Sequence, residues 1–420
     1  MNLDIQSLPA TCDVLVIGAG PAGSAAALTL VRAGLDVVLI DQHAFPRDKV
    51  CGDGLIPDAH HALRKLGVLD EVLAQAQASG FVGCVGPSGG RVDVPGVLAV
   101  LPRKELDLIL CRAAVAAGAR MFAPVRFIAP IEEGGRVVGA RLQHANLTRE
   151  LRAHWVLLAS GAVPQALLAA GMCERHTPSG VALRGYVKNE AMVGKVTALE
   201  IVWHRALSPG YGWIFPCPNG VFNIGVGIAD SHDERRSSKL KEEGFKKREI
   251  NLRHVMDDFT RVHTPARELM AGGSLLGPMK GAPLRCTLEG ARWSRPGLLV
   301  TGEAAGSTYS FSGEGIGKAM ETGIHAAEVL LAAGPLAKVD AQADAAVRGD
   351  YEARLNALKP RFELYKHANA VNRYPWLADL VIWRARKSAR VLGRMSGVLN
   401  ETSNPGNLLS VKGMLRLFTE

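Results

Sequence analysis

Residues 12–41 read CDVLVIGAGPAGSAAALTLVRAGLDVVLID, and this stretch decides the fold. A β-branched run ends at Ile17, a glycine-rich turn follows, and an alanine-rich stretch continues to Ala33. Gly34 is placed to end a helix there, and a second apolar run leads to Asp41. Strand, helix and strand in this order form a complete β-α-β unit, so the sequence predicts an α/β fold built on a Rossmann-type unit.

The turn between the first strand and the helix, GAGPAG, has the spacing GxGxxG. Gly18 permits a tight turn, Gly20 lets the backbone approach a pyrophosphate, and Gly23 lets the helix pack closely on the sheet. The helix N-terminus offers free N–H groups to phosphates, and Asp41 is placed to accept a hydrogen bond from a ribose hydroxyl. Because strand, helix and acid are all present, a dinucleotide site is favoured over a chance turn, although FAD and NAD fit equally. The candidate phosphate-binding residues are Gly18, Gly20, Pro21, Ala22 and Gly23.

The composition indicates a globular protein of more than one domain, because 420 residues exceed what one core usually supports. A net charge of +9 suits acidic ligands such as a pyrophosphate or an anionic membrane surface. Lys and Arg are spread along the chain without a basic tract interleaved with aromatics, which argues against nucleic-acid binding. Seven cysteines without a CxxC pair predict neither a disulfide framework nor a metal site, so a reducing, cytoplasmic setting is expected.

Two segments bear on targeting. The N-terminus lacks a charged region and a small-residue cleavage site, so no signal peptide is expected. The stretch Trp155–Cys173 has no charged residue but contains Gly161 and Pro164, which favours a strand, a turn and a short helix over a membrane span.

The rest of the chain mixes helical and strand-like patterns. Short strands separated by turns between about residues 180 and 229 predict an antiparallel sheet. A buried strand is predicted at Leu298–Val300. Helical periodicity marks four segments: Asp58–Leu66, Glu105–Ala117, Gly315–Leu331 and, with breaks at Pro360, Pro375 and Pro405, the chain from Asp344 onward.

Three distal segments carry more specific motifs. Residues 45–55 read FPRDKVCGDGL, residues 302–316 read GEAAGSTYSFSGEGI, and residues 211–216 read YGWIFP with Gly225 and Gly227 downstream. They resemble the PxxKxCG, GDAAG…TGEGI and YxWxFP…GxG signatures of the flavin-dependent geranylgeranyl reductase family. That family lies within the para-hydroxybenzoate-hydroxylase-like flavoproteins, which also include aromatic monooxygenases and flavin halogenases.

The resemblance implies FAD as the cofactor and a three-part organisation. A Rossmann-type FAD-binding domain would take residues 1–80, 101–165 and 280–345. An antiparallel-sheet substrate domain would take residues 81–100 and 166–279, and a helical C-terminal cap residues 346–420. NAD(P)H or a small electron carrier is expected as the electron donor.

The resemblance also implies cofactor contacts beyond the phosphate turn. Backbone N–H groups at the turn Gly313-Glu314-Gly315, leading into a helix, suit the N1/O2 edge of a flavin. Arg103 matches an arginine that contacts phosphate or ribose in relatives. The expected contacts are Asp41, Lys49, Cys51, Gly52, Arg103, Gly161, Gly302, Glu303, Gly313, Glu314, Gly315 and Ile316.

Three residues are candidates for catalysis: Lys49, Cys51 and Tyr211. Lys49 either balances flavin charge or is an exposed loop lysine. Cys51 either acts as a redox thiol or proton donor, or simply packs in a tight turn. Tyr211, Trp213 and Phe215 alternate along a predicted strand and so share one face, where they either line an apolar substrate cavity or pack in the core.

Three positions depart from the family pattern, and one of them bears on the reaction. Glu303 replaces a usual Asp, Ser310 replaces a common Pro, and Ser160-Gly161 replaces the Asp-Gly of many monooxygenases. The last change argues against a monooxygenase and allows an electron source other than NAD(P)H.

The sequence thus predicts an FAD-dependent reductase of carbon–carbon double bonds in an isoprenoid or similar apolar substrate. The alternative is an FAD-dependent monooxygenase or halogenase acting on an aromatic or polyketide-like substrate, although no WxWxIP signature of tryptophan-type halogenases is present. An FAD carrier without turnover is a third reading, disfavoured by the full set of flavin-facing motifs.

The segment Trp376–Arg394 reads as a basic amphipathic helix. Such a helix either lies on an anionic membrane, as a peripheral contact, or packs on the core with a solvated basic face.

Overall fold

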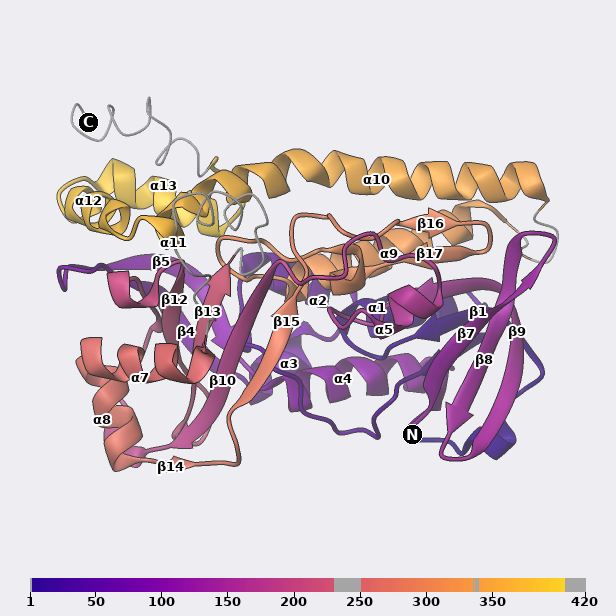
Figure 1. The fold of residues 1–420 in the computed structure, drawn as a ribbon, viewed down its shortest axis with the longest axis horizontal. Helices are drawn as coiled ribbons and strands as arrows, with labels where there is room; N and C mark the ends of the chain where they lie inside the picture. Colours follow the sequence, from indigo (N-terminus) through magenta and orange to yellow (C-terminus); the bar gives the residue numbers. More distant parts are fainter. Residues whose placement is uncertain (1, 230–250, 335, 337–339, 405–420) are drawn as a thin grey trace, which may run out of the picture.

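Two β-sheets organise the chain. The computed structural model describes residues 2–229, 251–334, 336 and 340–404. The two sheets lie side by side, and the long helix α10 (Ala341–Ala368) runs along the top of the molecule in Figure 1.

The first sheet contains the predicted β-α-β unit. Its strands β17, β9, β1, β2 and β6 are parallel neighbours, and helix α1 (Pro21–Arg32) connects β1 to β2. The strands are buried on both faces, which explains their continuous apolar runs. The order across the sheet is β16 (Ser294–Arg295), β17 (Leu298–Val300), β9 (Leu147–Leu158), β1 (Thr11–Ile17), β2 (Val37–Ile40) and β6 (Arg120–Phe122). In addition, β8 (Arg136–His144) pairs antiparallel with β9, and β7 (Arg126–Glu133) pairs antiparallel with β8.

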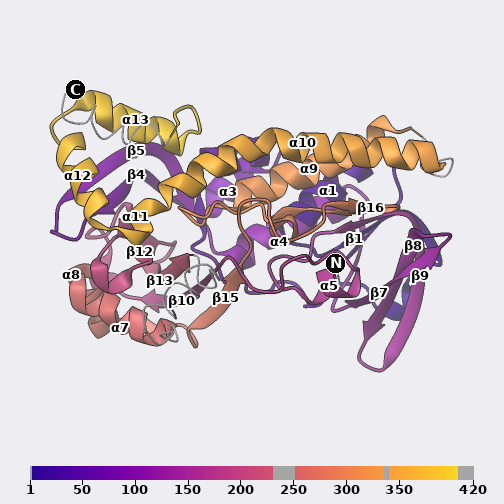
Figure 2. The ribbon, with the colours of Figure 1, turned by 45° about the horizontal axis from the view of Figure 1, so that its top comes forward.

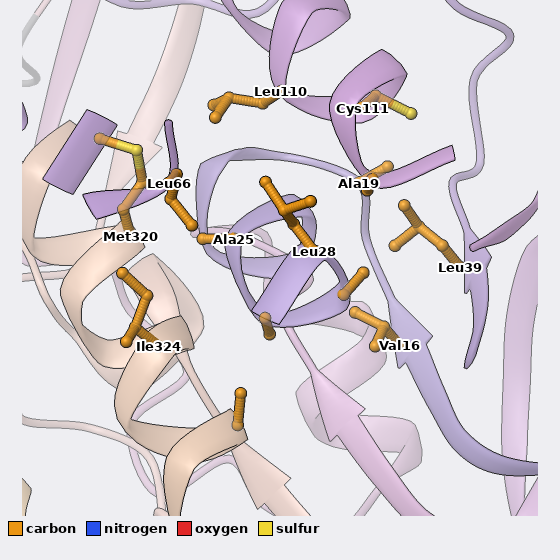
Figure 3. Packing of buried hydrophobic residues seen from close by; sticks show 14 of the residues in the cluster. Val16, Ala19, Ala25, Leu28, Leu39, Leu66, Leu110, Cys111, Met320 and Ile324 are labelled. Carbon is orange, nitrogen blue, oxygen red and sulfur yellow. The ribbon is translucent and has the colours of Figure 1, made fainter. Parts of the chain in front are cut away.

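Helices α1, α4 (Arg103–Ala116) and α9 (Ile316–Ala332) pack together on this sheet. Figure 3 shows Ala25 and Leu28 of α1 between Leu110 of α4 and Met320 of α9. The contact between α1 and α9 is close because a Cβ on Gly323 would lie 2.2 Å from the Ala22 carbonyl oxygen. Small residues therefore fix how these two helices meet below the site.

The second sheet confirms the predicted antiparallel block. Strands β10, β13, β12 and β11 are antiparallel neighbours, while β11 pairs in parallel with β4. The order is β14 (Ser274–Leu275), β10 (Gly180–Lys188), β13 (Val221–Ala229), β12 (Gly210–Pro216), β11 (Leu199–Val202), β4 (Gln77–Val85), β5 (Arg91–Val100) and β3 (Gly54–Leu55), with β15 (Lys280–Leu284) on β10.

Two segments differ from the expected division of the chain. Gly54–Leu55 and Lys280–Leu284, which were assigned to the cofactor domain, pair with the second sheet instead. The first segment follows β2 and the second follows β14, each through a loop, and they find their backbone hydrogen bonds on β5 and β10, which no local pattern could indicate.

Short helices fill the surroundings of the sheets. The charge-free stretch Trp155–Cys173 contains the end of β9, a turn and a short helix, as predicted. Among the described residues, no helix is long and apolar enough to cross a membrane. The remaining helices are α2 (Pro57–Lys65), α3 (Leu69–Gln75), α5 (Gln165–Ala169), α7 (Leu252–Val262) and α8 (Thr264–Gly272), with 3₁₀ turns at Ile5–Ser7, Glu190–Met192, Arg205–Leu207 and Gly302–Ala305.

The expected helix break at Pro360 is wrong. Helix α10 continues through this proline, because large side chains on both sides of it are held by the core. The Tyr351 hydroxyl donates to the Val300 carbonyl oxygen over 2.7 Å, and the Tyr365 hydroxyl donates to the Val398 carbonyl oxygen over 2.8 Å. This packing offsets the hydrogen bond that proline cannot make.

The single basic helix expected over Trp376–Arg394 is also wrong. Pro375 precedes α12 (Trp376–Ala385), but a separate α13 (Ala389–Leu399) begins after Ser388, whose hydroxyl accepts from the Val391 N–H. These two helices lie over β4 and β5 in the turned view of Figure 2, and α11 (Ala370–Arg373) lies on β12. The break expected at Pro405 lies outside the described residues.

Candidate functional site

A cavity of about 1020 Å³ runs between the two sheets. It begins just beyond the carboxyl ends of β1, β2 and β9, where ligands bind in open α/β sheets, and extends to helices α11–α13. Most of the predicted site residues line it, namely Gly18, Gly20, Pro21, Ala22, Asp41, Lys49, Cys51, Gly52, Arg103, Gly161, Tyr211, Trp213, Phe215, Glu303, Gly313, Glu314, Gly315 and Ile316. Gly23 and Gly302 lie behind the cavity wall, where they let backbones and α1 pack closely.

The glycines of the phosphate turn have different physical roles. Gly18 has φ +103°, and a Cβ there would lie 2.3 Å from the Ala159 carbonyl oxygen. A Cβ on Gly23 would lie 1.8 Å from the Gly18 carbonyl oxygen. A Cβ on Gly20, however, would meet no atom closer than 3.6 Å. The fold therefore requires Gly18 and Gly23, whereas the space at Gly20 is left open toward the cavity.

Asp41 is an ionised acceptor at the end of β2. Its carboxylate accepts from the N–H groups of Ala19 and His43, each over 3.0 Å. Burial raises the pKa of Asp41, but hydrogen bonding to His43 and the charge of Arg47 outweigh this and hold the pKa below its ordinary value. A carboxylate in this state suits a ribose hydroxyl.

Two arginines converge on the phosphate turn. Arg47 donates to Asp107 over 2.9 Å, and Arg103 donates to the two oxygens of the same carboxylate over 2.7 and 2.9 Å. A Cβ on Gly20 would lie 3.6 Å from Nη2 of Arg47 and 3.8 Å from Nη2 of Arg103. Both guanidinium groups thus face the point where phosphates are expected.

Sequence reasoning missed two members of this arrangement. Arg47 lies inside the quoted motif of residues 45–55 but received no role. Asp107 follows Arg103 by four residues on a helix, a spacing that places the two side chains together, and this signal was available.

The other end of the cofactor half is rich in unsatisfied polar groups. The first turn of α9 lines the cavity, and its N-cap is Gly315, which has no side chain to cap it. The hydroxyl oxygens of Ser307 and Ser310, in the segment before α9, are buried without a hydrogen-bond partner among the described residues, and so is that of Ser160, which lies beside Gly18 at the phosphate turn. The unpartnered Ser160 hydroxyl in the cavity wall and the open N-terminus of α9 fit a polar ligand such as a flavin with its ribityl chain.

Two carboxyl groups near α9, those of Glu314 and Asp58, have raised pKa values. Burial raises the pKa of Glu314 to about 8, and the charge of Asp58 adds to this effect. Burial likewise raises the pKa of Asp58 to about 7, against the opposing charge of Lys318. Both oxygens of Asp58 are buried without a described hydrogen-bond partner, and Lys318 Nζ lies 3.8 Å away. This corner of the cavity can therefore store a proton near neutral pH.

Lys49 and Cys51 lie on one loop beside the cavity. Lys49 Nζ is 3.8 Å from Glu303 Oε2, so the lysine faces the acid that replaces the family's usual Asp. Burial raises the pKa of the Cys51 thiol. A protonated thiol is a poor nucleophile but can still give up a proton, which narrows the chemistry open to Cys51.

The three aromatic residues of β12 share the cavity face, as their alternation predicts. The ring centroids of Tyr211 and Trp213 are 6.2 Å apart, and those of Trp213 and Phe215 are 6.4 Å apart. The Tyr211 hydroxyl donates to the Ser312 carbonyl oxygen over 2.5 Å, so the aromatic row reaches the loop before α9. Burial raises the pKa of Tyr211 above its ordinary value, which keeps this hydroxyl neutral.

Beyond the aromatic row the cavity becomes an apolar arm. Described residues from β4, β5, β11 and α11–α13 line it, and none of them is charged. Among them are Val82, Val94, Leu199, Val381, Ile382, Met395 and Leu399.

A family model indicates the cofactor, and curated relatives indicate the class of enzyme. Residues 11–267 match the family model described as FAD binding domain. The chain is 35% identical over 334 residues to a menaquinone reductase of Mycobacterium tuberculosis (strain H37Rv), covering 77% of this chain and 78% of that protein. It is 31% identical over 328 residues to a digeranylgeranylglycerophospholipid reductase of Methanosarcina mazei, covering 75% and 74%.

Solved structures share the whole fold. A geranylgeranyl bacteriochlorophyll reductase-like protein of Thermoplasma acidophilum superposes with a TM-score of 0.70 at 24% identity, covering 98% of this chain and 96% of that one. A flavin-dependent brominase superposes with a TM-score of 0.67 at 20% identity, covering 97% and 98%. At these identities the likeness concerns the fold alone.

Proposed function

The chain belongs to the geranylgeranyl-reductase-like family of FAD-binding flavoproteins, and from this premise we propose that it reduces carbon–carbon double bonds in an isoprenoid or similar apolar lipid. FAD is its cofactor. When bound and reduced, FAD supplies hydride. The protein's own task is to bind the cofactor, to hold an apolar chain against it, and to provide a proton.

We assign the two ends of the cofactor from the contacts described above. The pyrophosphate would lie at Gly20, facing Arg47 and Arg103, and the ribose would be held by Asp41. The isoalloxazine would lie at the first turn of α9, near Gly313 and Gly315. The unpartnered Ser160 hydroxyl, the open N-terminus of α9 and the open space at Gly20 support this placement.

The apolar arm is the observation that carries the proposed reaction. It is continuous with the cofactor half of the cavity, and its lining from three strands and three helices is uncharged. Burial of an isoprenoid chain contributes about 25 cal/mol for each Å² of apolar surface removed from water. A site of this kind holds a long hydrocarbon chain better than a compact aromatic acid.

The relatives narrow the substrate class. Menaquinone and digeranylgeranylglycerophospholipid differ in their head groups, but both molecules carry isoprenoid chains. We propose that the substrate of this chain does so too. The fold is shared with a brominase, so the alternative function is a monooxygenase or halogenase. The two curated relatives quoted above are both reductases, which favours the reductase.

A proton must join the carbon that does not receive hydride. We propose Cys51 as its donor, because the thiol stays protonated beside the cavity. Tyr211 would orient the loop at Ser312 through its short hydrogen bond, and Lys49 would balance negative charge on the cofactor. These three roles remain proposals.

Product analysis tests the reaction directly. The FAD-loaded protein is reduced with dithionite under anaerobic conditions and incubated separately with a geranylgeranyl lipid and with a menaquinone. The proposal expects a product whose isoprenoid chain fragment has gained two hydrogen atoms by mass spectrometry, whereas reduction of the quinone ring alone leaves the mass of that fragment unchanged. A substrate left unchanged without oxygen, but oxygenated or halogenated in air, contradicts it.

The electron donor is a separate proposal. NAD(P)H or a small electron carrier would reduce the flavin, and Ser160-Gly161 in place of Asp-Gly keeps both open. Anaerobic mixing with NADPH decides: bleaching of the flavin supports direct reduction, whereas an unchanged spectrum points to a carrier.

We also propose that the outer face of α11–α13 contacts an anionic membrane. Tyr374, Trp376 and Trp383 have 58%, 59% and 45% of their surface exposed. The same segment is rich in basic residues, namely Arg373, Arg384, Arg386, Lys387, Arg390 and Arg394. Aromatic and basic side chains together favour an anionic lipid surface, and the inner face of these helices walls the apolar arm, so lipid substrate would enter nearby.

Vesicle flotation tests this contact. The protein should float with vesicles that contain phosphatidylglycerol more than with pure phosphatidylcholine vesicles, and the double variant Trp376→Ser, Trp383→Ser should float less. Equal flotation of both proteins with both vesicles would refute the contact without affecting the proposed reaction.

A further inference from the structure

Asp53 is an unusual residue in the flavin-facing loop. It has φ +66°, a left-handed conformation that costs a non-glycine residue more than glycine, although Asp tolerates it better than most. It is completely buried two residues after Cys51. A glycine would suit this backbone, so the presence of a buried carboxyl here calls for a role of its side chain.

The carboxyl group of Asp53 collects three hydrogen bonds. Its Oδ2 accepts from the Tyr186 hydroxyl over 2.5 Å and from Asn223 Nδ2 over 2.7 Å, and its Oδ1 accepts from the Arg103 N–H over 3.2 Å. All three partners are donors, which fits a carboxylate because an ionised carboxylate only accepts. The group joins β10, β13 and the start of α4 at one point.

Asn223 extends these contacts in two directions. Its Oδ1 accepts from Trp213 Nε1 over 2.9 Å, at the substrate end of the cavity. Its Nδ2 also donates to the Cys51 carbonyl oxygen over 2.8 Å, in the turn beside the cofactor half. Asn223 is fully buried, so these bonds are shielded from water.

A second set of contacts holds the same loop. Arg184 donates to Asp48 Oδ1 over 2.6 Å and to the Lys49 carbonyl oxygen over 2.8 Å. Its guanidinium also lies 4.1 Å from the ring centroid of Tyr186. The loop from Asp48 to Asp53 is thus fastened to β10 as well as to β13.

We propose that Asp53 is a positioning residue that, through Asn223, holds the Trp213 indole and the Cys51 turn as one rigid unit. The inference rests on the proposed function, in which Trp213 contacts the apolar substrate and Cys51 faces the cofactor. One carboxylate then fixes the distance between Trp213, which contacts the bound isoprenoid chain, and the turn at Cys51, which faces the cofactor.

The ionisation of Asp53 gives this unit a measurable signature. Its charged and titratable neighbours are Arg184 and Tyr186 on β10, Arg103 on α4, Cys51 on its own loop, and Cys217 after β12. Burial raises the pKa of Asp53 to about 6, while hydrogen bonding from Tyr186 and the charge of Arg184 oppose that rise. Above this pH the carboxylate accepts all three bonds, and below it the added proton weakens the arrangement.

The indole N–H resonance of Trp213 reports on this unit without any substrate. In ¹⁵N-labelled protein, with and without FAD, the resonance is identified by its loss in Trp213→Phe. It should shift with pH around a midpoint of about 6. Asp53→Asn should abolish that shift, and Asp53→Gly, which suits the left-handed backbone, serves if the Asn variant does not fold. The matched control Asp70→Asn, at an exposed acid, should keep it. A Trp213 indole N–H chemical shift that changes neither with pH nor on substitution of Asp53 overturns the proposal.

A double-mutant cycle then tests the link to substrate. With a geranylgeranyl lipid as the probe and the protein saturated with FAD, Asp53→Asn and Trp213→Phe should each raise KM about five- to tenfold, the effect of one hydrogen bond. The double variant should be no worse than the poorer single one. Independent, multiplying effects contradict positioning through Asn223. If no lipid turns over at all, the proposed function fails while the resonance test still stands.

Discussion

The indole of Trp213 lies across Gly225 on the neighbouring strand, so that a Cβ on Gly225 would stand 2.1 Å from Cζ2 of the indole. The strand register places these two residues opposite one another, and Gly227 gives the ring further room, with its Cβ position 3.6 Å from Cζ3. The two glycines downstream of the aromatic motif thus make space for one side chain. Trp213 can lie flat on the sheet only because β13 has no side chains there.

The first prediction follows from this contact. Gly225→Ala should push the Trp213 indole into the apolar arm and lower kcat/KM for an isoprenoid lipid, while FAD binding persists because the cofactor half is untouched. Activity assays and the flavin absorption of the purified protein measure the two effects. Gly349→Ala, on α10 in open space, is the matched control and should change neither. A Gly225→Ala protein with full activity would show that the indole can move away harmlessly.

Truncating the indole tests the same assignment from the other side. Trp213→Ala should weaken use of the lipid about tenfold or more while FAD stays bound, because the lost contact area faces the substrate. Parallel losses of flavin and activity would instead make the aromatic row part of the core.

The second prediction separates the glycines of the phosphate turn. Gly20→Val should fold and lose FAD, because the protein leaves room for a side chain at this position but a pyrophosphate would not. Gly23→Ala should instead fail to fold, since its Cβ would meet the Gly18 carbonyl oxygen at 1.8 Å. Circular dichroism and flavin absorption distinguish the two failures. Stoichiometric FAD in Gly20→Val would refute the placement of the phosphates.

The third prediction concerns Arg47. Arg47→Met should weaken FAD binding about tenfold to a hundredfold, the effect of a charge-assisted hydrogen bond to phosphate. The difference in FAD affinity between the wild-type protein and the variant should be smaller at high salt, because salt screens the charge of Arg47. Titration of the FAD-free protein by flavin fluorescence measures this affinity. Arg149→Met, at an exposed position on β9, is the control. Unchanged affinity in Arg47→Met would leave Arg47 with only its structural bonds to Asp41 and Asp107.

The fourth prediction is a pH dependence of stability. The pKa of Glu314 in the folded protein is raised to about 8, so its contribution to stability is complete below its ordinary value of 4.5 and is lost as pH rises through 8. Glu314→Gln removes this loss. The melting temperature of the wild-type protein should therefore fall more steeply between pH 5 and 9 than that of Glu314→Gln. Parallel curves would show that Glu314 is ionised throughout.

Local patterns predicted the parts of the fold that are local in origin. The β-α-β unit, the antiparallel block and the helix after Gly315 follow from periodicity and glycine placement. The break at Pro360 failed because distant partners, Val300 and Val398, hold the helix on both sides of it. No window of sequence contains those partners.

The same distinction applies to the site. Most of the site residues that the motifs predicted do line the cavity, because each motif lies on one turn or strand. The bond from Arg47 to Asp107, and the bonds to Asp53 from Tyr186 and Asn223, connect residues far apart in the chain. Resemblance supplied no role for Asp53 because its partners are defined only by the folded backbone.

One rate comparison tests the central claim, that the protein transfers hydride from its reduced FAD to a carbon–carbon double bond. The enzyme is reduced anaerobically and mixed in a stopped-flow instrument with a geranylgeranyl lipid or, separately, with air-saturated buffer, and the return of oxidised flavin absorption is followed. The reductase account predicts fast reoxidation by the lipid, with a product that has gained two hydrogen atoms, and slow reoxidation by oxygen alone. A rate of flavin reoxidation that the lipid does not increase and that is fast in air-saturated buffer, together with an oxygenated or halogenated product, would contradict the reductase account.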